Sequence, residues 1–332
     1  MALGKFASAR ELAIGITRCA RIDRHPNLRM LLIALFAIPC GAALAAEQQG
    51  RSQLPVARSV FAPVLAPAGT LVLMVPFNQG LIVAADGRQT VFNRIYCDGA
   101  GKIIEPASPP RTIAVVTGNG VVVDYPHPVP DGEMCDYIKS APRILDIEAV
   151  VKRFLETSDV PLRSLKLEAL VQLCLNELVK FDGTHPGLLV QFLGTTMFQV
   201  VLANYDVESS TTVVRAFYGR IEKNGRVTFQ IAQDKSYSPE TDADWLMFGE
   251  ADYVSQHVLG PEGKAFYDPG LFERMKGHPI SEVSREEAIA LATHSLEAAS
   301  KTTTVIPAPT GIGGPSEVLA IGRDPRPEKI GQ

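Results

Sequence analysis

The sequence predicts an α+β protein in which two packed sheets lie between layers of helices. The first observation is a pair of apolar runs, 71–77 and 81–85, separated by Asn78-Gln79-Gly80. Asn and Gly accept the positive φ of a tight turn, so these runs indicate a β-hairpin. Both runs are almost continuously apolar, which is typical of strands covered on both faces. The second observation is the order of elements, which is strands, two helices, strands, helices and a last strand.

The other elements follow from periodicity and from capping signals. Asp146 is the expected cap of a first helix, and a second helix has Pro161 in its first turn and ends at Gly183. Ser284 opens a later helix through a capping box completed by Glu287. Beyond the hairpin, the expected strands cover 89–96, 102–105, 112–117, 188–193, 197–205, 211–222, 226–233 and the segment after Gly313-Gly314.

The first 46 residues are a different kind of sequence. Basic residues are spread up to Arg29, and an apolar run with an Ala-x-Ala pattern near Ala43–Ala45 follows. This pattern predicts a cleaved signal peptide and export to the periplasm or outside, with an uncleaved anchor as the alternative. Residues 47–69 are polar and then proline-containing, as expected of a propeptide or linker. The expected organisation is signal peptide 1–46, propeptide or linker 47–69, domain 70–324 and polar tail 325–332.

Composition excludes several classes of function. The formal net charge is −4, and no long basic run lies outside the leader, so nothing suggests nucleic-acid binding. The sequence has no P-loop, no dinucleotide-binding glycine motif after a strand, and no His-Glu-x-x-His. We therefore expect no cofactor, no metal, and no membrane contact beyond the export signal.

Three cysteines follow the leader, and their spacing fits no zinc motif. Cys174 lies in an apolar helical pattern and is expected in the core. Cys97 and Cys135 could form a disulfide in an oxidising compartment, but their positions in the sequence leave this open.

Thr70, Asp86 and Lys102 are the candidate catalytic side chains. Their spacings are equal, since 86 − 70 = 16 and 102 − 86 = 16. A threonine hydroxyl needs a neighbouring base to act as a nucleophile. Cleavage between Gly69 and Thr70 would supply that base as a free α-amine, which titrates near pH 8. A lysine would stabilise the developing alkoxide, and an aspartate would orient the lysine. The alternative is that Thr and Lys simply occupy solvated strand edges, where both are common.

The stretch that contains these residues resembles proteasome β-subunits and their bacterial relatives, the N-terminal-nucleophile (Ntn) hydrolases. The resemblance extends over residues 69–324 and rests on the Gly69-Thr70 junction, on Ala85-Asp86-x-Arg88-x-Thr90, and on Lys102-Ile103-Ile104. It implies a four-layer αββα sandwich of two antiparallel sheets, the Ntn hydrolase fold. It also implies processing after Gly69, catalysis by Thr70, Asp86 and Lys102, and an oxyanion contact from the backbone N–H of Gly118.

The chain departs from the pattern of that family at two supporting positions. Glu250 stands where the family has a serine, and the four residues ending at Ile312 lack an Asp-x-x-Ser pattern. Asp268 or the threonines 302–304 could take the place of these groups. The leading hypothesis is an exported threonine-type peptidase that is activated by autocleavage before Thr70, acts on peptide or amide substrates, and could form a homo-oligomer. The alternatives are a non-catalytic scaffold or binding protein, and an amidase acting on a small molecule or a cell-wall amide.

Overall fold

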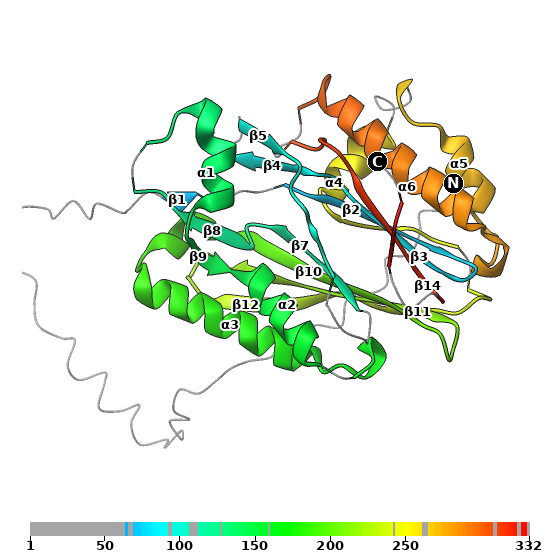
Figure 1. The fold of residues 1–332 in the computed structure, drawn as a ribbon, viewed down its shortest axis with the longest axis horizontal. Coiled ribbons are helices and arrows are strands. Elements are labelled where there is room, and N and C mark those ends of the chain that lie inside the picture. Colours follow the sequence, from blue (N-terminus) through cyan, green and yellow to red (C-terminus); the bar gives the residue numbers. More distant parts are fainter. Residues whose placement is uncertain are drawn as a thin grey trace, which may run out of the picture. The chain divides into compact units, whose positions relative to one another are not determined.

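The structure is a computed structural model, and Figure 1 shows its elements along the chain. The expected signal peptide lies outside the described residues, as does most of the expected propeptide. Among the described residues, no helix is both long and apolar enough to cross a membrane. The structure describes residues 64–65, 69–91, 95–105, 112–126, 128–158, 160–241, 243–260, 265–307, 311–323 and 327–330.

The predicted hairpin is at the centre of a five-stranded antiparallel sheet with the order β13-β2-β3-β14-β15. Every residue of β2 and β3 is buried, as the continuous apolar runs predicted. Part of the expected polar tail adds the short strand β15 to the edge of this sheet. The strands are β2 (Leu71–Phe77), β3 (Gly80–Ala85), β13 (Leu246–Gly249), β14 (Glu317–Gly322) and β15 (Glu328–Lys329).

A second five-stranded sheet has the order β12-β11-β10-β7-β6, and all its neighbouring strands are antiparallel. Its long β11–β12 hairpin turns at Gly225, which has a φ of 79° and therefore favours glycine. The predicted strands 102–105, 112–117, 197–205, 211–222 and 226–233 all belong to this sheet. The strands are β6 (Ile103–Ile104), β7 (Ile113–Gly118), β10 (Thr195–Asp206), β11 (Thr211–Ile221) and β12 (Val227–Tyr237).

Two smaller sheets correct the sequence-based assignment between residues 88 and 146. The range 89–96 was expected to be one strand, but it contributes to a two-stranded sheet of β4 (Arg88–Val91) and β5 (Ile95–Asp98). A three-stranded sheet, β1-β8-β9, was not predicted, and neither was helix α1 (Met134–Ser140). Its strands are β1 (Val64–Leu65), β8 (Val121–Asp124) and β9 (Arg143–Asp146).

A disulfide between Cys97 and Cys135 joins these additions, with the two Cα atoms 5.2 Å apart. It links β5 to α1, and a small apolar cluster that includes Val91, Val123 and Met134 packs beside it. The possibility that the sequence left open is therefore realised in the structure. Cys174 is a free thiol buried in the core, as expected, and burial raises its pKa to about 12.

The helices begin largely where the capping residues indicate. The Asp146 side chain accepts a hydrogen bond from the Ala149 N–H and caps α2 (Ile147–Thr157). The second helix, α3 (Leu167–Thr184), begins later than predicted, because the chain around Pro161 leads into a 3₁₀ turn at Leu162–Ser164. The range 188–193, expected as a strand, contains a 3₁₀ helix at Leu188–Phe192.

The last third of the described chain carries the remaining helices. Strand β13 leads into a single turn, α4 (Ala251–Tyr253), and then into a π-helical turn at Val254–Val258. Helix α5 (Pro269–Met275) follows, and α6 (Arg285–Thr303) begins at the predicted Ser284 capping box.

The buried residues form two main clusters on opposite faces of the second sheet. One cluster joins α6 and the β2–β3 sheet to Val115 and Val201. The other joins α2 and α3 to the sequence neighbours Val116 and Val200. Successive side chains of a strand point to opposite faces, so these pairs separate the two clusters. The described residues thus form an α+β protein with several antiparallel sheets. The α+β class was predicted correctly, but the sequence indicated only two sheets.

The capping box of α6 gives a test of the fold. Ser284 accepts a hydrogen bond from the Glu287 N–H, and the Glu287 carboxylate accepts from the Ser284 N–H at 3.0 Å. Ser284→Ala should lower the free energy of unfolding by about 1 kcal/mol, as measured by urea denaturation. Ser281→Ala, at an exposed position before the helix, is the control and should change it by less than about 0.5 kcal/mol. Equal effects of the two substitutions would show that the cap does not stabilise α6.

Candidate functional site

Thr70 lies immediately before β2 and is 5% exposed. Its hydroxyl donates a hydrogen bond to the carbonyl oxygen of Gly69 at 2.5 Å. Gly69 has a φ of 96°, a left-handed conformation that strongly favours glycine. The backbone at the expected processing junction therefore requires glycine on one side and holds the threonine hydroxyl against the junction's own carbonyl group.

Lys102 lies immediately before β6 in the second sheet, and its side chain reaches the same carbonyl group. The ammonium Nζ donates to the Gly69 oxygen at 2.8 Å and to Asp86 Oδ1 at 3.2 Å. It also donates to the Arg88 carbonyl oxygen. Burial lowers the pKa of Lys102, and the neighbouring Asp86 carboxylate opposes that shift.

Asp86 follows β3 in the first sheet and is 2% exposed. Besides Lys102, its Oδ1 accepts a hydrogen bond from the Leu71 N–H at 2.7 Å, and its Oδ2 accepts from the Gly313 N–H at 3.2 Å. The two backbone donors hold the carboxylate in place. The carboxylate is therefore the counter-charge of Lys102 and also fixes the position of the lysine side chain.

Thr70 and Lys102 line one small pocket, and Asp86 contacts Lys102 without lining it. Gly118 ends β7 on the pocket wall, and its φ of 78° again favours glycine. The structure therefore brings Gly69, Thr70, Lys102 and Gly118 together. The full lining is Gly69, Thr70, Gln89, Lys102, Val116, Gly118, Gly120, Val121 and Glu148.

Backbone groups contact Thr70 at Gly249 and Glu250, where this chain lacks the serine expected from the resemblance. The Glu250 N–H donates to the Thr70 carbonyl oxygen at 3.0 Å. Gly249 has a φ of 74°, and a Cβ added there would lie 1.8 Å from that same oxygen. The Gly249 N–H donates to Gln199 Oε1 at 3.2 Å. A glycine turn thus approaches Thr70 closely, through its backbone.

The proposed substitutes for the missing family groups lie elsewhere. Asp268 accepts a hydrogen bond from the Gly270 N–H, and its own N–H donates to His294 Nε2. Thr302 and Thr304 donate their hydroxyls to carbonyl oxygens of α6. None of these residues lines the pocket. Ile312 is fully buried, and the neighbouring N–H of Gly313 makes the contact with Asp86.

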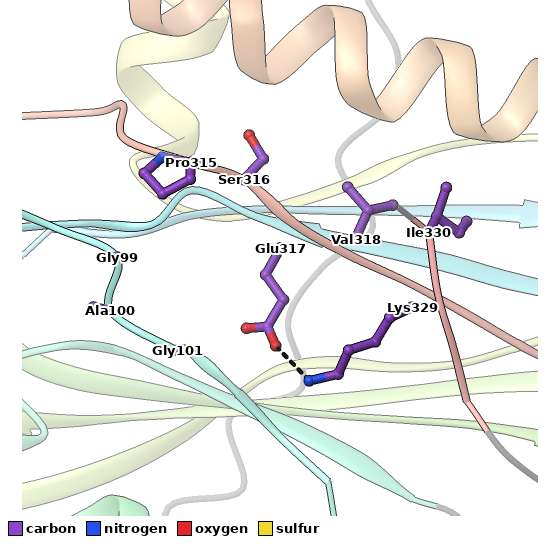
Figure 2. A pocket seen from close by; sticks show the side chains of 9 residues that line it. All are labelled: Gly99, Ala100, Gly101, Pro315, Ser316, Glu317, Val318, Lys329 and Ile330. Carbon is purple, nitrogen blue, oxygen red and sulfur yellow. Dashed lines mark ion pairs between the residues drawn. The ribbon is translucent and has the colours of Figure 1, made fainter. Parts of the chain in front are cut away.

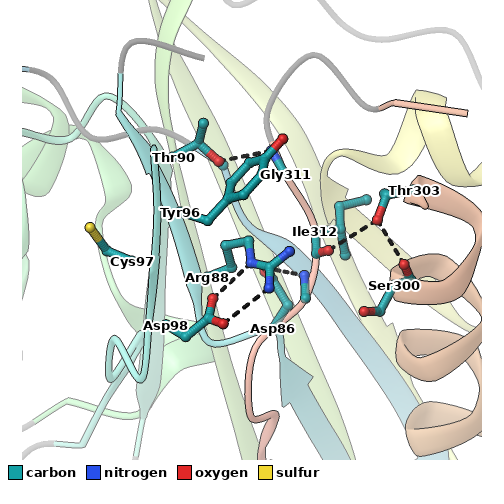
Figure 3. A network of polar contacts seen from close by, with 12 residues as sticks. Asp86, Arg88, Thr90, Tyr96, Cys97, Asp98, Ser300, Thr303, Gly311 and Ile312 are labelled. Atoms are coloured by element: carbon teal, nitrogen blue, oxygen red, sulfur yellow. Dashed lines mark hydrogen bonds and ion pairs between the residues drawn. The ribbon is translucent and has the colours of Figure 1, made fainter. Parts of the chain in front are cut away.

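A network of polar contacts lies beside Asp86 (Figure 3). The Arg88 guanidinium binds the Asp98 carboxylate with two hydrogen bonds, at 2.7 and 3.0 Å, and lies over the Tyr96 ring. The hydrogen bonds from Arg88 lower the pKa of Asp98. The Thr90 hydroxyl accepts from the Gly311 N–H at 2.8 Å. The network joins the β4–β5 hairpin to the segment before β14.

The backbone of Lys102 is held from the other side by Glu317 at the start of β14. Glu317 Oε2 accepts from the N–H groups of Lys102 and Ile103, both at 3.2 Å. Figure 2 shows Glu317 in a neighbouring pocket, where Lys329 Nζ lies 3.7 Å from its other oxygen. Glu317 thereby ties β14 of the first sheet to β6 of the second.

Glu148 is a pocket residue that the sequence did not indicate. It lies in the first turn of α2, and Arg143 Nη1 donates to its carboxylate at 2.9 Å. Burial raises the pKa of Glu148, and Arg143 opposes that shift. An acidic residue in the first turn of a helix is common for electrostatic reasons, so its position in the sequence carried no signal for the pocket.

The buried ion pair can be tested by its effect on stability. Asp86→Asn should lower the free energy of unfolding by about 3–5 kcal/mol, because it leaves the Lys102 ammonium buried without its counter-charge. Asp98→Asn breaks a pair whose side chains are 23% and 44% exposed, and should cost less than about 1 kcal/mol. Chemical denaturation of the full chain measures both. Equal losses would contradict a stabilising role of the buried Asp86–Lys102 ion pair.

No protein-family model matches the chain, and no curated protein matches it. Solved structures do match. An Anbu (Gly-1) mutant from Hyphomicrobium sp. strain MC1 is 13% identical with a TM-score of 0.42, and the match covers 79% of this chain and 87% of that chain. Anbu (ancestral beta-subunit) from Yersinia bercovieri is also 13% identical, with the same coverages and a TM-score of 0.40.

These findings correct the family assignment made from the sequence. The residues at 69–104 led us to expect a member of the proteasome β-subunit-like Ntn hydrolase family, but no family model places the chain there. The matching solved structures are Anbu proteins with TM-scores of 0.42 and 0.40 at 13% identity, and matches at this level assign no family to the chain. The function of the site must therefore be argued from its own geometry.

Proposed function

We propose that this protein is an amide hydrolase whose nucleophile is Thr70 and which becomes active when the Gly69–Thr70 bond is cut. The observation that carries the proposal is the set of groups around the Gly69 carbonyl. The Lys102 ammonium lies 2.8 Å from its oxygen, Asp86 holds Lys102, and the Thr70 hydroxyl contacts the same oxygen. A cation fixed against a carbonyl oxygen stabilises the negative charge that forms there when a nucleophile adds.

The cleavage step uses only groups present at the junction and water. Thr70 Oγ1 adds to the Gly69 carbonyl carbon and gives its proton to a water molecule, which later passes a proton to the Thr70 nitrogen, and negative charge develops on the carbonyl oxygen beside Lys102. The C–N bond then breaks, the Thr70 nitrogen takes a proton, and Gly69 is left as an ester on Oγ1. Water hydrolyses that ester, which releases a carboxylate at Gly69 and a free amine and hydroxyl at Thr70.

The same residues then act on an external peptide. The α-amine of Thr70 is proposed as the general base that takes the hydroxyl proton, and Lys102 lowers the cost of the alkoxide. Asp86 orients Lys102, and the Gly118 N–H is proposed to bind the oxyanion of the substrate. An ester forms on Oγ1, and the amine product leaves with the proton that the α-amine had taken. Water then hydrolyses the ester, which releases the acyl part of the substrate as a carboxylate and restores the Thr70 hydroxyl group. Peptide substrates are proposed because the junction itself is a peptide bond.

Three further expectations are proposals. The Cys97–Cys135 disulfide supports export, since disulfides persist in oxidising compartments outside the cytosol. The two core clusters, on opposite faces of the second sheet, support a four-layer αββα sandwich. A homo-oligomer stays a prediction.

A non-catalytic binding protein is the second candidate. The observation that favours it is the chemistry at two positions near the site. A glutamate, Glu250, stands where a serine was expected, and Ile312 has an aliphatic side chain. In that case the Gly69–Thr70 bond stays intact, and Thr70 never gains a free amine. A small-molecule amidase would instead cleave the bond and then prefer short amides to peptides.

Replacement of Thr70 separates these functions. Thr70→Ala removes the attacking oxygen and should abolish cleavage after Gly69, whereas Thr70→Ser keeps a hydroxyl and should retain cleavage at a reduced rate. Intact-mass spectrometry of the purified full chain measures the cut fraction. Thr304→Ala is the matched control, because it removes a threonine hydroxyl at the exposed end of α6. Cleavage in Thr70→Ala equal to that in the control would exclude Thr70 as the nucleophile.

A further inference from the structure

Strand β1 precedes the proposed cleavage site and pairs with β8 in antiparallel orientation. Val64 is opposite Asp124, and Leu65 is opposite Val123. Counting back from the Gly69–Thr70 bond, Leu65 and Val64 are the fifth and sixth residues before it. The segment that the proposed cleavage would release is therefore bound through main-chain pairing to a strand of the same protein.

Strand β8 begins at the pocket and is firmly held on its other side. Gly120 and Val121 line the pocket with Thr70, and β9 pairs along the edge of β8 that faces away from β1. The Asp124 N–H donates to the Pro142 carbonyl oxygen at 3.0 Å, and the Tyr137 hydroxyl donates to the Asp124 carbonyl oxygen at 2.6 Å. The position of the edge of β8 that faces β1 is therefore fixed by contacts that do not involve β1.

We propose that this edge of β8 is a docking surface for an extended peptide substrate, a proposal that rests on the proposed function. Once β1 is released, one edge of β8 has main-chain groups that need partners, and an added strand satisfies them. An incoming peptide takes the place and direction of β1, with its fifth and sixth residues before the cleaved bond opposite Val123 and Asp124. Main-chain pairing of this kind tolerates many side chains, so the substrate class is an unstructured peptide with at least six residues before the cleaved bond.

The binding test uses the full chain without requiring catalysis. Thr70→Ala blocks cleavage, and a combined Val64→Pro and Leu65→Pro change removes both N–H donors of the chain's own strand. A labelled peptide with the sequence of residues 62–69 is then titrated while its fluorescence anisotropy is recorded. The chain with Thr70→Ala alone is the control, because its β8 edge is already occupied. Circular dichroism and a cooperative unfolding transition show whether both chains are folded.

Alternation along an antiparallel pair supplies a matched control within the peptide. Only one of two adjacent residues points its N–H toward the partner strand. Two modified peptides are compared, one N-methylated at the residue equivalent to Val64 and one at the residue equivalent to Leu65. One of them should bind about fivefold or more weakly than the unmodified peptide, and the affinity of the other should stay closer to that of the unmodified peptide. Equal affinities of all three peptides, or no binding to the proline variant, would overturn the proposal.

A kinetic test on the cleaved protein distinguishes this proposal from the proposed function. Peptides with seven residues before the cleaved bond should have a higher kcat/KM than peptides with three, and N-methylation at the sensitive position should remove the gain. A kcat/KM that does not depend on the number of residues before the cleaved bond would exclude the docking surface but would be consistent with the proposed hydrolase activity. Peptide binding with the predicted N-methyl sensitivity, without hydrolysis of any peptide, would support the surface and refute the hydrolase.

Discussion

The buried pair of Lys102 and Asp86 is the interaction on which the rest of the site depends. Asp86 follows a strand of the first sheet, and Lys102 precedes a strand of the second, so the pair forms only where the two sheets meet. Removing two charges from water is costly unless other hydrogen bonds satisfy them. Here the Leu71 and Gly313 N–H groups and the Gly69 carbonyl oxygen provide those bonds. The carbonyl at the junction is thus part of what stabilises the buried lysine.

Backbone groups replace side chains at several points around this pair. Gly69, Gly118 and Gly249 each have a positive φ, and each places main chain next to Thr70 or in the pocket that it lines. Glu250 contributes its N–H to Thr70, although its side chain differs from the expected serine. A site built in this way tolerates changes of side chain as long as the glycine conformations persist. This explains how Thr70 is held despite the departures at Glu250 and Ile312.

The sequence predicted the elements that have strong local signals and missed those that depend on distant contacts. The β2–β3 hairpin, the Asp146 cap and the Ser284 capping box were correct because turn and cap residues act locally. Thr70, Asp86 and Lys102 were offered by the sequence as one candidate site, and the structure brings them together around the Gly69 carbonyl group. Their catalytic role stays a prediction. Strand β8 follows a turn, and helix α1 follows a proline-rich stretch. Both elements are too short for hydrophobic periodicity to identify them. Glu148 reaches the pocket only through the packing of α2, which no local pattern encodes, and the family assignment required correction.

The central claim is that the chain cuts its own Gly69–Thr70 bond. The most direct measurement is the intact mass and N-terminal sequence of the purified full chain, followed over time at several protein concentrations. An intramolecular reaction has a rate constant that does not depend on concentration, so we expect a product beginning at Thr70 that appears at the same rate at every dilution. A chain whose Gly69–Thr70 bond stays uncut would contradict the account.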